Sequence, residues 1–487
     1  SITSAEIGKQ PVSNVLAALP GRIAGAQIAQ NNGLPGSAVQ IQIRGQGSLS
    51  SGTIPLYVID GVPFTNFNGG SPATDNLNAF GISGANGGIS PFSMINPNDI
   101  ERIDILKDAD ATAIYGSRGA NGVVLITTKR GQSGKTKFDV NASTGFTELN
   151  RFIPMLSPDQ YYDLRTQAFK NDGVTPNTSN APDLMLWDRT KTTDWQKYFL
   201  GGTGKVNDVQ TSLSGGDTFT KFMFNLGYRN ETTIFPGDYS STRFSSRLNL
   251  DHSTRNKKLN FTLALSYSKD KTNLPQSDLT SVYNLPPNLP LYDANGKMFW
   301  SNNFTNPLST LFRQNNANTS NLISNATVRY NVTKGLNLKA NFGYTVTDLE
   351  QKNLTPASVL NPASNPTSTL NFADTRAQNY IIEPTAEYVK EIGKGKLLAV
   401  VGASWQHNTS NGFSLTATNY STEALLNTLS GAGLVTVNYN NIVEYKYNAI
   451  FGRVNYDWQG KYFVNATFRR DGSSRFGPNN RFGNFGA

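Results

Sequence analysis

The residue types that usually carry enzyme chemistry are scarce in this chain of 487 residues. It contains no cysteine, which excludes disulfides, thiolate zinc sites and cysteine nucleophiles. Its two histidines, His252 and His407, are too few for a histidine-based metal site. Both lie in or beside predicted strands, away from any recognisable nucleophile turn. We therefore expect no catalytic residues, no metal and no cofactor, and the chain is not predicted to be an enzyme.

Two glycine-containing segments imitate nucleotide-binding motifs. Residues 131–136 end like a Walker A loop, but Lys129 stands where its first glycine is required, and a strand follows instead of a helix. Residues 45–47 follow a strand, yet Ser50 replaces the third glycine of the dinucleotide fingerprint. The net charge of +9 comes from scattered lysines and arginines. We therefore reject both nucleotide sites and expect no nucleic-acid partner.

The composition favours strands and turns. Only 16% of the residues are charged, against roughly 25% in a typical soluble domain, while glycine, tyrosine and phenylalanine are plentiful. The mean hydropathy is -0.39. No apolar run approaches the roughly 18 residues that a membrane helix needs. Helical membrane spans are thereby excluded, whereas barrel strands, which are apolar on one face only, stay possible.

Residues 1–133 read as a small mixed α/β domain. Residues 14–28 show a helical pattern that Pro20 and Gly21 interrupt. The glycine-rich segment 65–90 is too long for a plain connector, which indicates a functional loop. The pattern predicts strands at residues 39–44, 55–60, 100–106 and 122–129 and a short helix at 109–115.

After Gly134 the pattern changes to period two. Within residues 221–229, Phe222, Phe224, Leu226 and Tyr228 fall on one face and polar residues on the other. Each such stretch has about 10 residues, the length of a tilted strand that crosses a bilayer. The same alternation is found in residues 243–251, 259–268, 322–332, 336–345 and 461–471.

The connections between these strands also alternate. Short turns are predicted at residues 216–220, 254–258, 333–335, 392–396 and 457–461, and long polar loops at 271–320, 350–375 and 410–443. Aromatic residues lie near strand ends, as at Tyr267, Tyr344, Tyr456, Trp458 and Tyr462. Short turns at one end, long loops at the other and aromatic girdles are typical of an outer-membrane barrel. A soluble β-sandwich or surface adhesin is the alternative, but one-sided long loops would be unusual there.

Four motifs of the first domain, at residues 39–48, 55–63, 96–108 and 111–129, closely resemble the plug domain of TonB-dependent outer-membrane transporters. The form of residues 117–122 and of residues 468–477 is similar to the SusC/RagA-type branch found in Bacteroidetes. The resemblance implies an all-β transmembrane barrel of about 22 antiparallel strands with a mixed α/β plug in its lumen. The plug would be residues 1–133, and residues 134–487 would be the N-terminal half of the barrel with long extracellular loops.

Only about eleven strands can be counted between residues 134 and 471, half of such a barrel. Two open edges in hydrocarbon would cost roughly tens of kcal/mol, because each unpaired backbone group costs several. We therefore expect the chain to be the plug and first half of the barrel of a longer protein.

The resemblance also implies a function, TonB-dependent active import of an oligosaccharide or peptide nutrient across the bacterial outer membrane. The protein would be a multi-pass protein of that membrane, in contact with its lipid. A SusD-like surface lipoprotein would hold the substrate against the plug, the TonB–ExbB–ExbD complex would supply the work, and two transporter–lipoprotein pairs would form a dimer. The alternatives are a ligand-gated signalling receptor on the same fold, which needs an extension before Ser1, and an adhesin or porin.

Two sets of candidate site residues follow from this resemblance. Aromatic rings among amides suit sugars and peptides alike, although packing of the same rings is an equal alternative. The substrate-binding candidates are Phe64, Asn66, Phe67, Asn68, Phe80, Asn86 and Phe92. Polar plug residues would bond the inward side chains of the barrel, or else serve only to determine the fold. The candidates for plug–barrel contacts are Arg44, Glu101, Lys107, Asp108, Arg118, Arg469, Arg470, Asp471 and Arg475.

One helix is predicted in the first long loop. In residues 156–169, Ser157 is placed as N-cap, Pro158 at the first helical position and Gln160 at the third. Such a loop would lie outside the membrane. It would form part of the surface that meets the lipoprotein, or pack against other loops.

Overall fold

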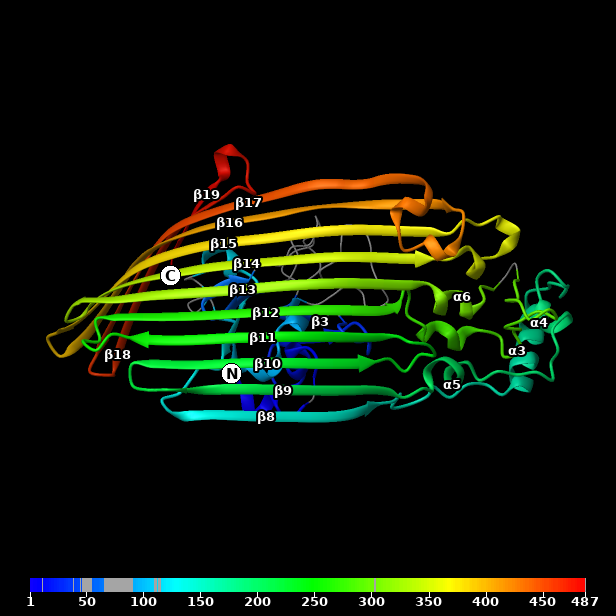
Figure 1. The fold of residues 1–487 in the computed structure, drawn as a ribbon, viewed down its shortest axis with the longest axis horizontal. Coiled ribbons are helices and arrows are strands. Elements are labelled where there is room, and N and C mark those ends of the chain that lie inside the picture. The colour runs from blue at the N-terminus through cyan, green and yellow to red at the C-terminus, as the bar shows by residue number, and fades with distance from the viewer. Residues whose placement is uncertain are drawn as a thin grey trace.

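The computed structural model describes residues 1–10, 12–37, 39–43, 45, 55–64, 91–108, 112, 115–301 and 304–486. Its main body is a curved antiparallel sheet of 12 strands. A small domain built from the N-terminal residues lies behind the middle of this sheet (Figure 1). The shape is that of a barrel wall with a domain on its inner side.

The small domain contains a five-stranded sheet with the order β1-β6-β7-β4-β5 and a separate β2–β3 hairpin. Strands β4 and β7 are parallel, and the other pairs are antiparallel. Buried aliphatic residues from nearly every element, such as Leu16, Ile43, Ile103 and Ile126, form its core. The elements are β1 (Ile2–Thr3), α1 (Ser4–Ile7), β2 (Ala26–Gln30), β3 (Val39–Ile43), β4 (Leu56–Ile59), β5 (Val62–Phe64), β6 (Ile100–Leu106) and β7 (Val123–Thr128).

The predicted strands of this domain are present as β3, β4, β6 and β7. The interrupted helical pattern at residues 14–28 forms no α-helix: a 3₁₀ turn at Val15–Ala18 is followed by strand β2. Gly21 and Gly25 have φ angles of 74° and 78°, which a right-handed helix cannot contain. The helix predicted at 109–115 falls largely outside the described residues.

The large sheet runs in chain order from β8 to β19, and these two outer strands do not pair with each other within the described chain. Short turns join the strands at one end, at the predicted positions. The strands are β8 (Gly134–Thr147), β9 (Gly204–Gly216), β10 (Thr220–Thr232), β11 (Ser240–Ser253), β12 (Leu259–Pro275), β13 (Gln314–Thr333), β14 (Leu336–Thr355), β15 (Thr369–Ile392), β16 (Gly395–Tyr420), β17 (Ala432–Trp458), β18 (Tyr462–Ser473) and β19 (Phe482–Gly486).

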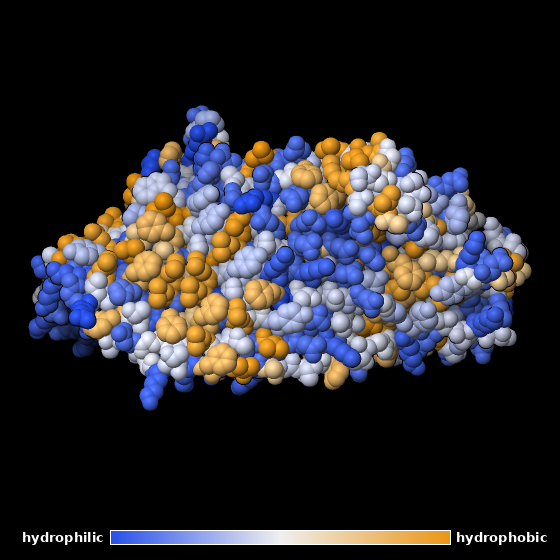
Figure 2. All heavy atoms as spheres, viewed as in Figure 1, coloured by the Kyte–Doolittle hydropathy of each residue, from blue (hydrophilic) through white to orange (hydrophobic). Residues whose placement is uncertain are grey.

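The two faces of the sheet differ in polarity, as the alternation predicts. On β10 and β11 the apolar residues Phe224, Tyr228 and Phe244 are exposed on the outer face. Arg247 and Asn249, on the opposite face, are buried under the small domain. Figure 2 shows the outer face, where apolar residues gather mainly over the half of the sheet nearer the short turns. The sheet therefore has the inside-out polarity of a membrane barrel.

The strands are longer than the predicted 10 residues, and the loops are correspondingly shorter. Strands β13 to β17 have 20 to 27 residues. The loop predicted at 410–443 is reduced to residues 421–431. Beyond the apolar band the strands are rich in Asn, Ser and Thr on both faces, so their sequence reads as loop while their backbones remain paired.

The long loops carry the helices α3 (Pro158–Asn171), α4 (Pro182–Met185), α5 (Trp195–Leu200) and α6 (Pro307–Phe312) at the other end of the sheet (Figure 1). Helix α3 begins with the predicted capping box of Ser157 and Gln160. No helix among the described residues is long and apolar enough to cross a membrane.

An apolar cluster ties these loops together, and we call it the loop cluster. Leu34, in the turn between β2 and β3, belongs to it and is 7% exposed. The small domain therefore touches the loops as well as the wall. The other buried members are Trp187, Trp195, Phe199, Leu200, Phe235, Tyr239, Leu274, Leu279, Val282, Leu289, Leu308 and Leu311.

Candidate plug–barrel interface

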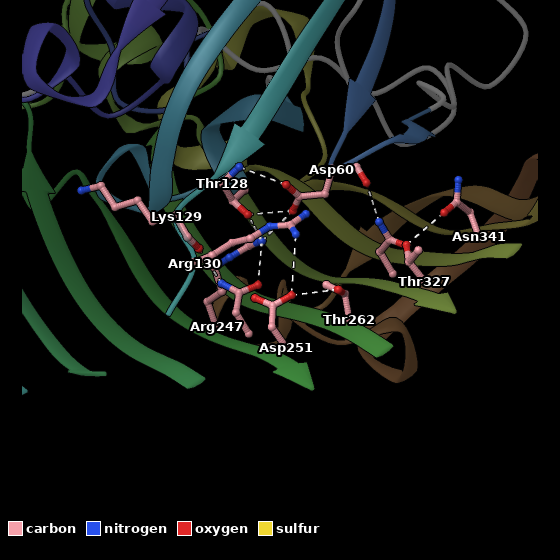
Figure 3. Close-up of polar contacts among 11 residues, drawn as sticks. Asp60, Thr128, Lys129, Arg130, Arg247, Asp251, Thr262, Thr327 and Asn341 are labelled. Atoms are coloured by element: carbon pink, nitrogen blue, oxygen red, sulfur yellow. Dashed lines mark hydrogen bonds and ion pairs between the residues drawn. The ribbon is translucent and has the colours of Figure 1, made fainter. Parts of the chain in front are cut away.

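A buried ion pair joins the centre of the small domain to the wall. Asp60 and Gly61 form the two-residue turn between β4 and β5, both with positive φ, as an Asp-Gly hairpin turn requires. Arg247 of β11 donates from Nη2 to Asp60 Oδ2 over 2.8 Å, and the two side chains are 4% and 5% exposed. Thr128, at the end of β7, donates its amide and hydroxyl to the same carboxylate over 3.0 and 2.7 Å. Arg247 also donates to the Thr128 hydroxyl (Figure 3).

Neighbouring wall residues bond the backbone at the same place. Asn325 Nδ2 of β13 donates to the Asp60 carbonyl over 2.6 Å. Asn249 Nδ2 of β11 donates to the Lys129 carbonyl over 2.8 Å. Arg130 pairs with Asp251 at 3.6 Å, just before the chain enters β8 (Figure 3). The ends of β4 and β7 are thus fixed to the wall by hydrogen bonds and ion pairs.

A second group of contacts surrounds residues 96–99. Asn96 Nδ2 donates to Gln210 Oε1 of β9, and Asn225 Nδ2 of β10 donates to Asp99 Oδ1, each over 2.6 Å. Burial raises the pKa of the Asp99 carboxyl above its usual range, opposed by the nearby charge of Arg247 and the bond from Asn225. The small domain therefore meets the wall here through polar side chains, while Ile323 of β13 packs with its apolar core.

A third contact brings together two segments that lie far apart in the sequence. A Cβ on Gly116 would lie 2.8 Å from the Arg469 side chain of β18, so only glycine fits there. Arg118 donates from Nη1 to Gln406 Oε1 over 2.7 Å and lies 3.9 Å from Glu383. Its guanidinium stacks 4.3 Å from the centre of the Tyr447 ring.

Comparison with known proteins identifies this arrangement. The model of the TonB-dependent receptor plug domain matches residues 1–123. The receptor SusC of Bacteroides thetaiotaomicron is 29% identical over 520 residues, which cover 99% of this chain and 47% of SusC. The chain is a homologue of the SusC-type TonB-dependent receptors.

Another relative, TonB-dependent receptor P3 of Formosa agariphila, is 28% identical over 501 residues, covering 100% of the chain and 46% of that protein. Among solved structures, the RagAB peptide importer in its closed-closed state matches with a TM-score of 0.80 and 25% identity, over 100% of this chain and 56% of that one. The ferric citrate transporter FecA, at 12% identity and a TM-score of 0.57, shares the fold. The chain spans about half the length of these relatives.

The predicted plug–barrel contact residues take different positions in the structure. Arg118, Arg469 and Asp471 meet at the interface, where Arg469 bonds Asp471 over 2.6 Å and the Tyr447 hydroxyl over 2.8 Å. Lys107 bonds the Ala24 carbonyl within the plug over 3.5 Å.

Four of the other predicted contact residues belong to the described chain. Glu101 and Asp108 are exposed. Arg470 is exposed beside Asn484, and Arg475 stacks on the Tyr445 ring. Arg44 lies outside the described residues.

The predicted substrate-binding residues fall into two groups. Phe64 and Phe92 pack in the plug core with ring centres 5.8 Å apart, and both are buried. In this conformation their rings are not accessible to a substrate. Asn66, Phe67, Asn68, Phe80 and Asn86 lie outside the described residues.

Sequence reasoning missed several of the residues that bond the plug to the wall. Asp60, Thr128 and Asn225 were not among the candidates. Arg247 and Asn249 were visible only as members of a polar strand face. A charged residue on the inward face of a barrel strand is the signal that could have found Arg247, because such a charge needs a partner on the plug.

Proposed function

We propose that the chain is the plug and adjoining wall of a transporter that imports a nutrient across the bacterial outer membrane. Residues 1–133 are the plug and residues 134–487 the wall in this proposal. The observation that carries it is a separate α/β domain, bonded to the polar inner face of a sheet whose outer face is apolar. SusC and RagAB relatives support the same function.

The chemistry of the interface suits a plug that must move. A hydrogen bond contributes about 0.5–1.5 kcal/mol net, because water can replace the partner. An interface of such bonds can open and reform at moderate cost, whereas separating a broad apolar contact would expose all of its area to water. We infer that TonB, driven through ExbB and ExbD, supplies the work that rearranges the plug. The import needs no covalent chemistry, so we propose no enzymatic activity for the protein.

The substrate class proposed is an oligosaccharide or a peptide, delivered by a SusD-like lipoprotein. RagAB is a peptide importer, and the similarity of this chain to it supports a peptide as the substrate. Similarity to SusC links the chain to a receptor of the same branch. In the proposal, Asn66, Phe67, Asn68, Phe80 and Asn86 bind the substrate, and Arg118, Arg469 and Asp471 are plug–wall contacts.

The test is uptake by a strain that lacks the gene. We expect the deletion to abolish uptake of one labelled oligosaccharide or peptide pool, and the intact gene to restore it. A proton uncoupler should stop uptake in the restored strain. A variant without residues 1–133 should instead give leaky uptake that the uncoupler does not affect. Uptake through the intact protein that continues in the presence of the uncoupler would refute active import.

A further inference from the structure

The outer face of strands β9 to β12 changes character abruptly along the strands. Tyr228, Phe244 and Tyr267 are exposed on β10, β11 and β12 and mark the border of the apolar band on the side of the long loops. Cross-strand pairing aligns Tyr228 with Phe244, and Tyr267 lies diagonally beside them. Aromatic residues take this position where hydrocarbon gives way to headgroups.

Three lysines follow directly beyond this border. Lys269 pairs with Phe244 across the strands and Lys271 with Thr242, so both share the outer face with the aromatic residues. Lys205 lies on the outer face of β9, where its backbone amide donates to the Thr232 hydroxyl. All three lysines are exposed. In the described parts of the chain, no carboxylate lies within 4.0 Å of their ammonium groups.

These charges lie at the level of the headgroup layer and at its outer edge. A barrel strand tilted by about 40° advances roughly 2.6 Å along the membrane normal per residue. Lys269 and Lys271, two and four residues beyond Tyr267, therefore lie about 5 and 10 Å outside the aromatic border. The headgroup region is roughly 5–8 Å thick on each side of the hydrocarbon.

A row of neutral hydrogen-bonding side chains crosses β9, β10 and β11 and ends at Lys271 on β12. Asn207, Asn230, Thr242 and Lys271 are consecutive cross-strand partners on β9 to β12. Asn230 Nδ2 donates to the Thr242 hydroxyl over 2.9 Å. The row spans three strand spacings, about 14 Å. Amides and hydroxyls suit sugar hydroxyls, and lysine is a point charge that suits phosphate.

The neighbouring sector lacks this excess of positive charge. On β14 and β15 the outward cations are already paired, Lys352 with Glu350 at 3.6 Å and Arg376 with Asp348 at 3.5 Å. Near the lysine sector, Lys197 pairs with Asp194 at 3.5 Å. The excess on β9–β12 is therefore absent from β14 and β15.

We propose that the outer face of β9–β12 binds a membrane lipid with a phosphorylated saccharide headgroup. The acyl chains of the lipid lie against the aromatic border, and its phosphate lies between Lys269 and Lys271. Its sugar lies on the cross-strand row that runs from Asn207 on β9 to Lys271 on β12, and Lys205 lies at the β9 end of this row. The inference rests on the proposed membrane location but is independent of what is imported.

The test compares two variants of the whole protein purified from its membrane. One carries Lys269→Ser and Lys271→Ser. The matched control carries Lys334→Ser and Lys394→Ser, which remove the same charge from exposed turns at the other end of the sheet. Each is placed in phosphatidylcholine nanodiscs, and binding of added monophosphorylated lipid A is measured by native mass spectrometry. Gel mobility with and without heating checks folding.

We expect the first variant to bind lipid A roughly 30-fold more weakly than the native protein, from about fivefold for each lysine near a charged surface. The control should bind within about twofold of the native protein. Equal losses in both variants would show attraction by net charge alone and overturn the proposal. Displacement of the lipid by millimolar inorganic phosphate would also overturn it. Uptake of the nutrient should persist in the first variant, so failure here is distinct from failure of the import proposal.

Discussion

Replacing Arg247 with methionine should loosen the plug by a measurable amount. The substitution leaves the Asp60 carboxylate, 5% exposed, without its guanidinium partner. Removing one member of a buried ion pair costs about 3–5 kcal/mol, because the remaining charge stays desolvated. At about 1.4 kcal/mol for each factor of ten, even 3 kcal/mol raises the population of the opened plug roughly 100-fold.

A single cysteine can report this opening, since the chain has none of its own. Ser245 of β11 is buried where the plug meets the wall, with its hydroxyl 3.5 Å from Asn96 Nδ2, and Ser245→Cys is close in size. The rate of thiol labelling in native membranes then follows the population of the opened plug. We expect Arg247→Met to accelerate labelling by roughly 100-fold or more.

Two further variants make the result interpretable. Arg329→Met breaks an exposed pair with Glu387, at 45% and 38% exposure, and should change labelling by less than about fivefold. Asp60→Asn combined with Arg247→Met removes both charges, and asparagine tolerates the positive φ of this turn. The double variant should label more slowly than Arg247→Met alone. If Arg247→Met behaves like Arg329→Met, the ion pair does not hold the plug and the reasoning is wrong.

Three other outcomes can be measured with the same label. Gly116→Ala should accelerate labelling, because its Cβ would overlap the side chain of Arg469; Gly45→Ala, whose Cβ has open space, isolates the cost of positive φ. Leu34→Ala should weaken the contact of the plug with the loop cluster by about 2–4 kcal/mol, and labelling unchanged from the native protein would contradict that contact. The raised pKa of Asp99 means that its stabilising contribution is present below pH 4 and is lost as the pH rises through the folded-state pKa. Asp99→Asn should therefore make labelling less dependent on pH above 4, and an unchanged pH profile would exclude this carboxyl as the cause.

The wall was predictable because its signal is local. Phe222 to Tyr228 alternate with polar residues on β10, and a period of two needs no knowledge of the rest of the fold. The short turns were found for the same reason. The outer halves of β15 to β17 were not recognised as strands, because residues such as Asn408, Ser410 and Ser414 of β16 are polar although their backbones remain paired.

The interface was less accessible from sequence. Arg247 and Asp60 are separated by 187 residues, and their pairing depends on where the plug sits against the wall. A strand pattern shows that Arg247 points inward but not which carboxylate it meets. The meeting of Gly116 with Arg469 was equally hidden, although both belong to motifs that carried the resemblance.

The position of Leu34 has a consequence for communication between the long loops and the plug. This side chain belongs to the plug hairpin β2–β3 and yet is packed among Trp187, Leu279 and other loop residues. Any molecule that binds preferentially to one arrangement of those loops must, by thermodynamic reciprocity, favour one position of the hairpin, and the hairpin must influence its affinity equally. Leu34 thus gives the occupied or empty state of the outer loops a direct mechanical route to the plug.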